Sequence, residues 1–190
     1  MTAFEFAHRF CAKWEGGLTD DAADRGGLTH WGVSIAFLSD RARHDADWLR
    51  VIGVQLPVTR KTIQALTREQ AEKIFRRVFW DPYRLDELPM QIATVLYDCG
   101  VNAGMPQSVK LAQRGFNACM PEVHLVVDGV LGPLTRAALS KHCTSTVLGK
   151  ILDARVEFYA SIVKKRPSQK VFLSGWLNRV KDLRTYVGAQ

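Results

Sequence analysis

The sequence predicts a mainly α-helical fold with one small element that is not helical. Apolar residues recur at spacings of three and four along most of the chain, which is the period of a helix that buries one face. Capping boxes, in which a Thr stands three positions before a Glu or Gln, mark helix starts at Thr2 and Thr67. The glycine-rich stretch 18–32 has no helical period, so we expect a loop or a small β-hairpin there.

The first half of the chain begins with the clearest of these helices. It runs from Thr2 to about Trp14, and Gly16 and Gly17 end it. The other helices expected in this half cover 34–40, 46–52 and a segment from Thr67 to the Asp81-Pro82 pair.

Proline and glycine punctuate the second half. Pro89 opens a helix that Gly104 ends, and Pro106 restarts the chain in the next helix. The remaining segments are an irregular or weakly β stretch at 121–133, a helix beginning at Pro133, a long helix at 146–163 and a last helix with apolar residues from Trp176 to Val187.

The composition excludes several classes of protein. The 190 residues are 47% hydrophobic and 24% charged, which is ordinary for a packed domain and unlike a disordered chain. Apolar runs such as 92–97 are far shorter than the roughly 20 residues of a membrane span. Because Glu5, His8 and Arg9 interrupt the N-terminal apolar residues, we expect no signal peptide and reduced thiols at the four cysteines. No His and Cys cluster has metal-ligand spacing, so neither a metal ion nor a cofactor is expected.

Glu15 is the strongest candidate for a catalytic residue. It follows Trp14 at the end of the first predicted helix, where the partial negative charge of the helix terminus and an apolar neighbour both favour a protonated carboxyl group. Asp24 follows across the glycine-rich stretch, and two carboxylates in different environments are the minimum equipment for cleaving a glycosidic bond. Each also has an ordinary explanation: Glu15 as an acceptor of bonds from the backbone amides of the next turn, and Asp24 as a turn aspartate.

The combined motifs resemble glycoside hydrolase family 108, a lysozyme-like family often found in phage and prophage genomes. The resemblance covers nearly the whole chain. In the first half it lies in Glu15-Gly-Gly, Asp24-x-Gly-Gly-x-Thr-x-x-Gly-Val and the segments Phe79-Trp-Asp and 96–104. The second half resembles the predicted peptidoglycan-binding module that accompanies this family, through the segments 127–135 and 175–179.

The resemblance implies roles for three residues. The glutamate of the Glu-Gly-Gly motif is the family's catalytic acid and corresponds to Glu15. The wider phage-lysozyme pattern has an Asp nine positions further on, which Asp24 matches, and a Thr six positions after that. Thr29 lies only five positions after Asp24, so its correspondence, in which it would help to hold a water molecule, departs from the pattern.

Four further residues are candidates for binding substrate. Asp98 and Asn102 share a helix face away from the apolar stripe, and the resemblance implies that they line a cleft. A solvated face or a buried bond between helices explains them equally well. Trp31 and Tyr97 are the aromatic residues that we expect near sugar rings, although aromatic residues at helical spacing more often belong to a core.

The net charge of +7 is concentrated at the C-terminal end. Residues 155–190 contain eight Lys or Arg and two Asp or Glu, a net of +6, whereas residues 1–154 contain 18 and 17, a net of +1. A basic surface favours polyanions, so anionic wall polymers or a membrane surface are candidate partners. Nucleic acid is not expected, because the basic stretch lacks interleaved aromatic residues and a known motif.

These observations predict a lysozyme-like fold with a catalytic lobe at 1–88 and a helical peptidoglycan-binding-like lobe at 89–190, together forming one compact unit that is a monomer. The predicted activity is that of an N-acetylmuramidase, a lysozyme that cleaves the β-1,4 glycosidic bond of peptidoglycan by general acid catalysis; a lytic transglycosylase reaction stays open. The alternative is a non-catalytic peptidoglycan-binding or secretion-activating protein with the same fold. As an endolysin-type protein it would be made in the cytoplasm and reach the cell wall through a holin or another non-classical route.

Overall fold

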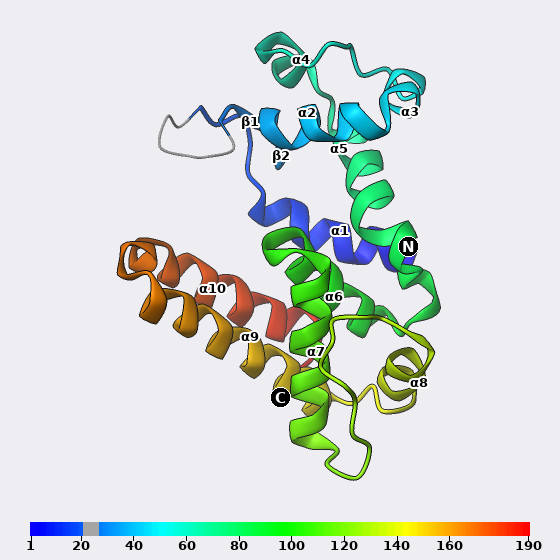
Figure 1. The fold of residues 1–190 in the computed structure, drawn as a ribbon, viewed down its shortest axis with the longest axis vertical. Coiled ribbons are helices and arrows are strands. Elements are labelled where there is room, and N and C mark those ends of the chain that lie inside the picture. The colour runs from blue at the N-terminus through cyan, green and yellow to red at the C-terminus, as the bar shows by residue number, and fades with distance from the viewer. Residues whose placement is uncertain (21–26) are drawn as a thin grey trace. The chain divides into compact units, whose positions relative to one another are not determined.

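The computed structural model describes residues 1–20 and 27–190 and confirms the predicted fold class (Figure 1). The described residues form ten α-helices and one antiparallel hairpin of two short strands. In chain order these elements are α1 (Ala3–Trp14), β1 (Thr29–His30), β2 (Val33–Ser34), α2 (Ile35–His44), α3 (Ala46–Val51), α4 (Arg60–Ala65), α5 (Arg68–Phe75), α6 (Met90–Ala103), α7 (Met105–Cys119), α8 (Pro133–Lys141), α9 (Ser145–Lys165) and α10 (Lys170–Tyr186). Four short turns complete them: the π-helical η1 (Arg76–Trp80) and the 3-10 turns η2 (Asp81–Tyr83), η3 (Leu85–Glu87) and η4 (Pro167–Gln169).

The chain forms two compact units. The larger unit consists of residues 1–10 and 79–190, and the smaller unit consists of residues 11–78. The chain therefore passes from one unit to the other inside α1 and again inside η1. The division at residue 88 was drawn on sequence patterns and stays a prediction.

The larger unit is a helical bundle in which α7 packs against α6 and α9, and α10 packs against α9. The backbones of α7 and α9 come into direct contact because Gly115 has no side chain. A Cβ atom at this position would lie 2.5 Å from the backbone nitrogen of Ile151. The bundle core includes the fully buried side chains of Ile92, Val109, Phe116, Leu139, Val147, Leu152 and Leu183.

The smaller unit contains the hairpin and four short helices, α2 to α5. These helices have between six and ten residues, and isolated helices of that length are marginal in water. A shared core must therefore hold them. It is built from Val33, Leu38, Leu49, Ile63 and Ile74, whose side chains are all fully buried.

Capping boxes define helix starts as the sequence predicts. The amide of Thr2 donates to Glu5 Oε2 at 2.8 Å and the amide of Glu5 donates to Thr2 Oγ1 at 3.2 Å. Thr67 and Gln70 make the same reciprocal pair at α5. A third box, Thr59 with Thr62, begins α4, which the sequence analysis did not predict. That helix has only six residues, too few to show a helical period, and its box has Thr in place of Glu or Gln.

A small hairpin, one of the two structures predicted for the glycine-rich stretch 18–32, begins in this stretch and ends beyond it. Thr19 pairs with Thr29 in an isolated bridge, while the strands pair Thr29 with Ser34 and His30 with Val33. The second strand thus ends two residues after the predicted limit. Ser34 then caps α2, since its side chain accepts a bond from the amide of Phe37.

The close approach of α7 and α9 predicts opposite effects for two glycine substitutions. Gly115→Ala forces a methyl group into the backbone of α9 and should lower the free energy of unfolding by about 1–3 kcal/mol. Gly175→Ala in α10 meets no atom within 4 Å, so the gain in helix propensity should raise it by roughly 0.5–1 kcal/mol. Urea denaturation of both variants measures the difference, and equal stabilities would contradict the packing described for Gly115.

Candidate active site

Glu15 lies directly after the last residue of α1. Its backbone amide donates to the carbonyl of Cys11 at 3.2 Å, which is the final helical hydrogen bond. Gly16 then adopts a left-handed conformation with φ +69°, a common way for a helix to end. The helix terminus and the glycine together fix where the half-buried Glu15 side chain leaves the backbone.

The hairpin turn packs directly on this side chain. Trp31 and Gly32 form the two-residue turn, with φ of +52° and +77°. A Cβ atom on Gly32 would lie 2.7 Å from Glu15 Cβ, 3.0 Å from Glu15 Cγ and 3.0 Å from Phe75 Cζ. Only glycine leaves room for Glu15 here, so the turn packs against the carboxylate-bearing side chain, and Phe75 of α5 packs against the same turn.

Trp31 is held in an unfavourable backbone conformation by its side chain. A left-handed conformation costs a non-glycine residue about 1–2 kcal/mol. The indole Nε1 donates to the carbonyl of Leu66 at 3.0 Å, and the guanidinium of Arg68 lies 5.0 Å from the ring centroid. His30 stacks on the same indole at 4.7 Å and donates from Nδ1 to the carbonyl of Ile63. These contacts stabilise the turn that presses Gly32 against Glu15.

Two contacts near Glu15 were not predicted as features of the site. The thiol of Cys11 donates to Glu15 Oε1 at 3.8 Å, and the ring of Phe75 lies against the turn. Cys11 could have been found from the sequence, because residues four apart share a helix face. Phe75 could not have been found, because it reaches the site from another helix.

Of the two other predicted catalytic residues, the structure describes Thr29. Thr29 lies on β1, half-buried, and its hydroxyl donates to the carbonyl of Gly27 at 3.1 Å. Its oxygen can still accept a hydrogen bond. Asp24 lies outside the residues that the structure describes.

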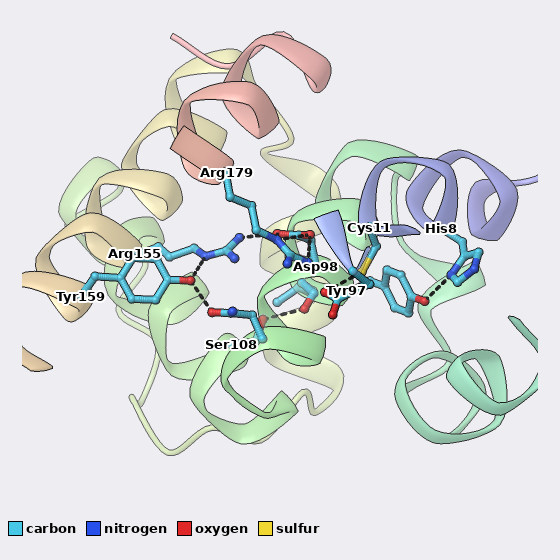
Figure 2. Close-up of polar contacts among 11 residues, drawn as sticks. His8, Cys11, Tyr97, Asp98, Ser108, Arg155, Tyr159 and Arg179 are labelled. Atoms are coloured by element: carbon cyan, nitrogen blue, oxygen red, sulfur yellow. Dashed lines mark hydrogen bonds and ion pairs between the residues drawn. The ribbon is translucent and has the colours of Figure 1, made fainter. Parts of the chain in front are cut away.

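Tyr97, in the larger unit, is a core residue. Its side chain is fully buried, and its ring makes edge contacts with those of Phe4 and Trp80. Its hydroxyl lies 2.8 Å from His8 Nδ1. Figure 2 marks this contact with a dashed line. These are the contacts of a core residue, which was the alternative to the predicted role near a sugar ring, and that role stays a prediction.

Asp98 is fully buried on α6 between two arginines (Figure 2). Arg155 Nη1 of α9 donates to Oδ2 at 2.6 Å, and Arg179 Nη2 of α10 donates to Oδ1 at 2.7 Å. Burial opposes ionisation most strongly, but the two guanidinium groups outweigh it and hold the pKa of Asp98 below its usual value. Both carboxylate oxygens are therefore occupied by a bond between helices, which was the alternative to the predicted binding role.

Asn102 is the member of this set that reaches solvent. It is exposed at the end of α6, and its Oδ1 accepts a 2.5 Å hydrogen bond from the hydroxyl of Tyr159. The same hydroxyl accepts a bond from Arg155 Nε at 2.8 Å, and burial raises the pKa of Tyr159. A polar chain thus leads from the buried Asp98 to an exposed amide.

The predicted site residues therefore fall into two groups. Thr29 and Trp31 belong to the hairpin whose Gly32 contacts Glu15, all within the smaller unit. Tyr97, Asp98 and Asn102 belong to the larger unit. A pocket of about 360 Å³ in the smaller unit involves neither group, since it is lined by Ser39, Ala42, Arg43, Ala46, Arg50, Leu56, Pro57 and Val58.

The described residues contain neither a cluster of metal ligands nor a helix that could span a membrane. No three His, Cys, Asp or Glu side chains at 1–20 and 27–190 gather where they could hold a metal ion. Within the same ranges, no helix is both long and apolar enough to cross a bilayer.

The mainly helical fold of this chain, with a first helix that ends at a glutamate against a small hairpin, is lysozyme-like. Residues 8–104 match the model of the Glycosyl hydrolase 108 family, and because this match covers half of the chain, the chain belongs to that family. Residues 107–181 match the Predicted Peptidoglycan domain. The resemblance inferred from the motifs is thereby confirmed.

A solved structure supports the same conclusion. The structure of SagA from Brucella abortus is similar over 97% of this chain and 92% of that chain, with 26% sequence identity and a TM-score of 0.73. A comparison with curated proteins gave no match. The pairing of a glycosyl hydrolase 108 domain with a peptidoglycan domain implies a peptidoglycan hydrolase.

The Asp98 cluster predicts a specific dependence of stability on substitution and pH. Asp98→Asn leaves two buried guanidinium groups without their counter-charge and should lower the free energy of unfolding by about 3–5 kcal/mol. Because the folded-state pKa is depressed, the contribution of Asp98 is complete above the unfolded pKa of about 3.9 and is lost as the pH falls further. Denaturation between pH 7 and pH 3 should show this loss in the wild type and a smaller loss in the variant.

Asp153→Asn is the matched control, because Asp153 also pairs with an arginine of α10 but is half exposed. Its effect should stay within about 1 kcal/mol. If both substitutions cost the same, burial does not distinguish the Asp98 pair.

Proposed function

We propose that this chain is an N-acetylmuramidase, which hydrolyses the β-1,4 bond between N-acetylmuramic acid and N-acetylglucosamine in peptidoglycan. The observation that carries the proposal is the placement of Glu15 at the end of α1, with its Cβ and Cγ packed on Gly32. A general acid must be held within hydrogen-bond reach of one substrate oxygen, so a side chain whose Cβ and Cγ atoms are packed on a turn is suited to this role.

In the proposed step, the protonated carboxyl group of Glu15 donates its proton to the glycosidic oxygen. The bond between that oxygen and the anomeric carbon of N-acetylmuramic acid breaks, and its electron pair leaves with the oxygen. A water molecule adds its oxygen to the anomeric carbon and releases one proton to a carboxylate. The products are a new hydroxyl group on N-acetylglucosamine and a reducing end on N-acetylmuramic acid.

Asp24 is the proposed second carboxylate, which stays ionised and receives the proton from water or stabilises the positive charge on the sugar ring. Thr29 is proposed to orient the water. Its hydroxyl hydrogen is engaged by the carbonyl of Gly27, and the oxygen remains able to accept a bond from the water. Trp31 is proposed to lie near the sugar, since it neighbours Gly32 in the turn that contacts Glu15.

Two alternative functions are compatible with the same fold. In a lytic transglycosylase, the C6 hydroxyl of N-acetylmuramic acid replaces water and leaves an anhydro end, so one catalytic glutamate is enough. In a non-catalytic wall-binding or secretion-activating protein, the chain would bind peptidoglycan and release nothing. An endolysin role with holin-type release stays a prediction from the resemblance.

Mass spectrometry of fragments released from purified peptidoglycan distinguishes these reactions. The wild type should release fragments with reducing N-acetylmuramic ends. Glu15→Gln keeps the shape of the side chain but cannot donate the proton, so the rate should fall by about 10²–10⁴-fold.

Glu122→Gln is the control, because Glu122 is an exposed residue between α7 and α8. Its activity should equal that of the wild type. Anhydro ends on the released fragments would identify the reaction as transglycosylation in place of hydrolysis. A Glu15→Gln protein that is as active as the wild type would show that Glu15 is not the proton donor.

Gly32→Ala tests whether the turn positions Glu15. The added methyl group would have to lie 2.7 Å from Glu15 Cβ, so we expect the carboxyl group to shift and kcat to fall by about 10²-fold with a small change in KM. Gly53→Ala is the matched control, because Gly53 also has a left-handed φ, of +84°, but a Cβ there meets only the flexible end of Gln70 at 3.2 Å. Equal losses of kcat in the two variants would show that backbone strain alone accounts for the effect.

A further inference from the structure

Three aromatic rings form a stacked row between α9 and α10, which Figure 1 shows lying side by side. The rings of Tyr159 and Trp176 have centroids 5.0 Å apart and planes inclined by 25°. Those of Trp176 and Phe172 are 6.0 Å apart and inclined by 28°. We call these three residues the aromatic row. It runs from a ring that is fully buried to one that is exposed to solvent.

The buried end of the row is rigidly anchored. The hydroxyl of Tyr159 accepts a hydrogen bond from Arg155 Nε and donates one to Asn102 Oδ1. Arg155 is in turn fixed by its ion pair with the buried Asp98. A ligand that stacks on the outer rings therefore needs little further ordering of side chains, which lowers the entropic cost of binding.

The outer end of the row, at Phe172, is exposed to solvent. Phe172 is 53% exposed, and two neighbouring apolar residues of α10, Val171 and Leu177, are 77% and 36% exposed. A single exposed apolar residue is ordinary, but an exposed ring at the end of a stacked row offers a flat apolar face to a ligand.

The charges around this end have one sign. Lys164, Lys165, Arg166 and Lys170 are exposed where α9 gives way to α10, and none of them forms an ion pair with a described residue. From residue 158 to residue 181 the sequence contains no Asp or Glu. The exposed Phe172 ring therefore lies near a stretch of chain whose cations are free to bind an anionic ligand.

We propose that the aromatic row and its four cations are the surface through which this chain holds peptidoglycan, with Phe172 and Trp176 stacking on sugar rings and the cations pairing with carboxylates of the peptide stems. The inference rests on the proposed peptidoglycan specificity but not on turnover at Glu15. All of these residues lie within 107–181, the segment that matches the Predicted Peptidoglycan domain. Flat apolar ring faces suit the C–H faces of sugars, and the ligand is polyanionic as the charges require.

The test is co-sedimentation with purified sacculi, carried out with the Glu15→Gln chain so that the ligand is not degraded. Phe172→Ser in this background should bind at least about tenfold more weakly. Lys164→Gln with Lys170→Gln should weaken binding at low salt and make it less dependent on salt, because exposed charges are screened. Phe172 is half exposed, so its replacement should leave the melting temperature nearly unchanged.

Two controls match these variants. Val126→Ser removes an apolar side chain that is 70% exposed between α7 and α8, and Arg114→Gln with Lys141→Gln removes two exposed cations elsewhere in the larger unit. Both should bind sacculi like the Glu15→Gln chain.

Four outcomes would overturn the inference. Wild-type-like binding by Phe172→Ser would exclude the row while leaving the muramidase proposal intact, and equal losses in the controls would make the binding non-specific. A loss seen with phosphatidylglycerol vesicles but not with sacculi would assign the surface to a membrane. If the Glu15→Gln chain binds no sacculi and the wild type releases no fragments, the proposed function fails as well.

Discussion

The larger unit depends on one buried carboxylate. Asp98 lies at 0% exposure with two arginines from different helices bonded to its oxygens. Both guanidinium groups must stay within reach of the one carboxylate, because an unpaired ion in a low-dielectric interior costs several kcal/mol. The requirement fixes α6, α9 and α10 relative to one another within this unit. It also fixes Tyr159, whose ring begins the aromatic row.

In the smaller unit, the position of Glu15 depends on a residue without a side chain. Gly32 has no Cβ, and that space is taken by the Cβ and Cγ atoms of Glu15. The turn that brings Gly32 there also requires a left-handed tryptophan, which is held by its bond to Leu66 and by the neighbouring Arg68. Backbone strain of this kind persists where the surrounding contacts over-determine it, and it is concentrated at functional sites. The proposed role of Glu15 as the proton donor accounts for such a close packing.

The two units thus suggest a division of work. The smaller one contains Glu15, the proposed proton donor, and the larger one contains the surface proposed to hold the polymer. For an enzyme whose substrate is an insoluble network, a second contact with the same polymer raises the local concentration of cleavable bonds even when each contact is weak. This would explain why a basic, aromatic surface accompanies a glycosidase domain on one short chain.

The sequence by itself determined the helical fold, most helix starts and the identity of Glu15 as the principal candidate, because capping boxes, helical periods and a glycine after a helix are local features. Tertiary structure alone decided the rest. Asp98 has partners 57 and 81 positions away, so its pattern on the helix fitted a binding face and a buried bond equally well. Tyr97 likewise became a core residue through rings from distant segments. The packing of Gly32 on Glu15, with Phe75 against the same turn, arises from three separate elements, and no spacing along the chain encodes such contacts.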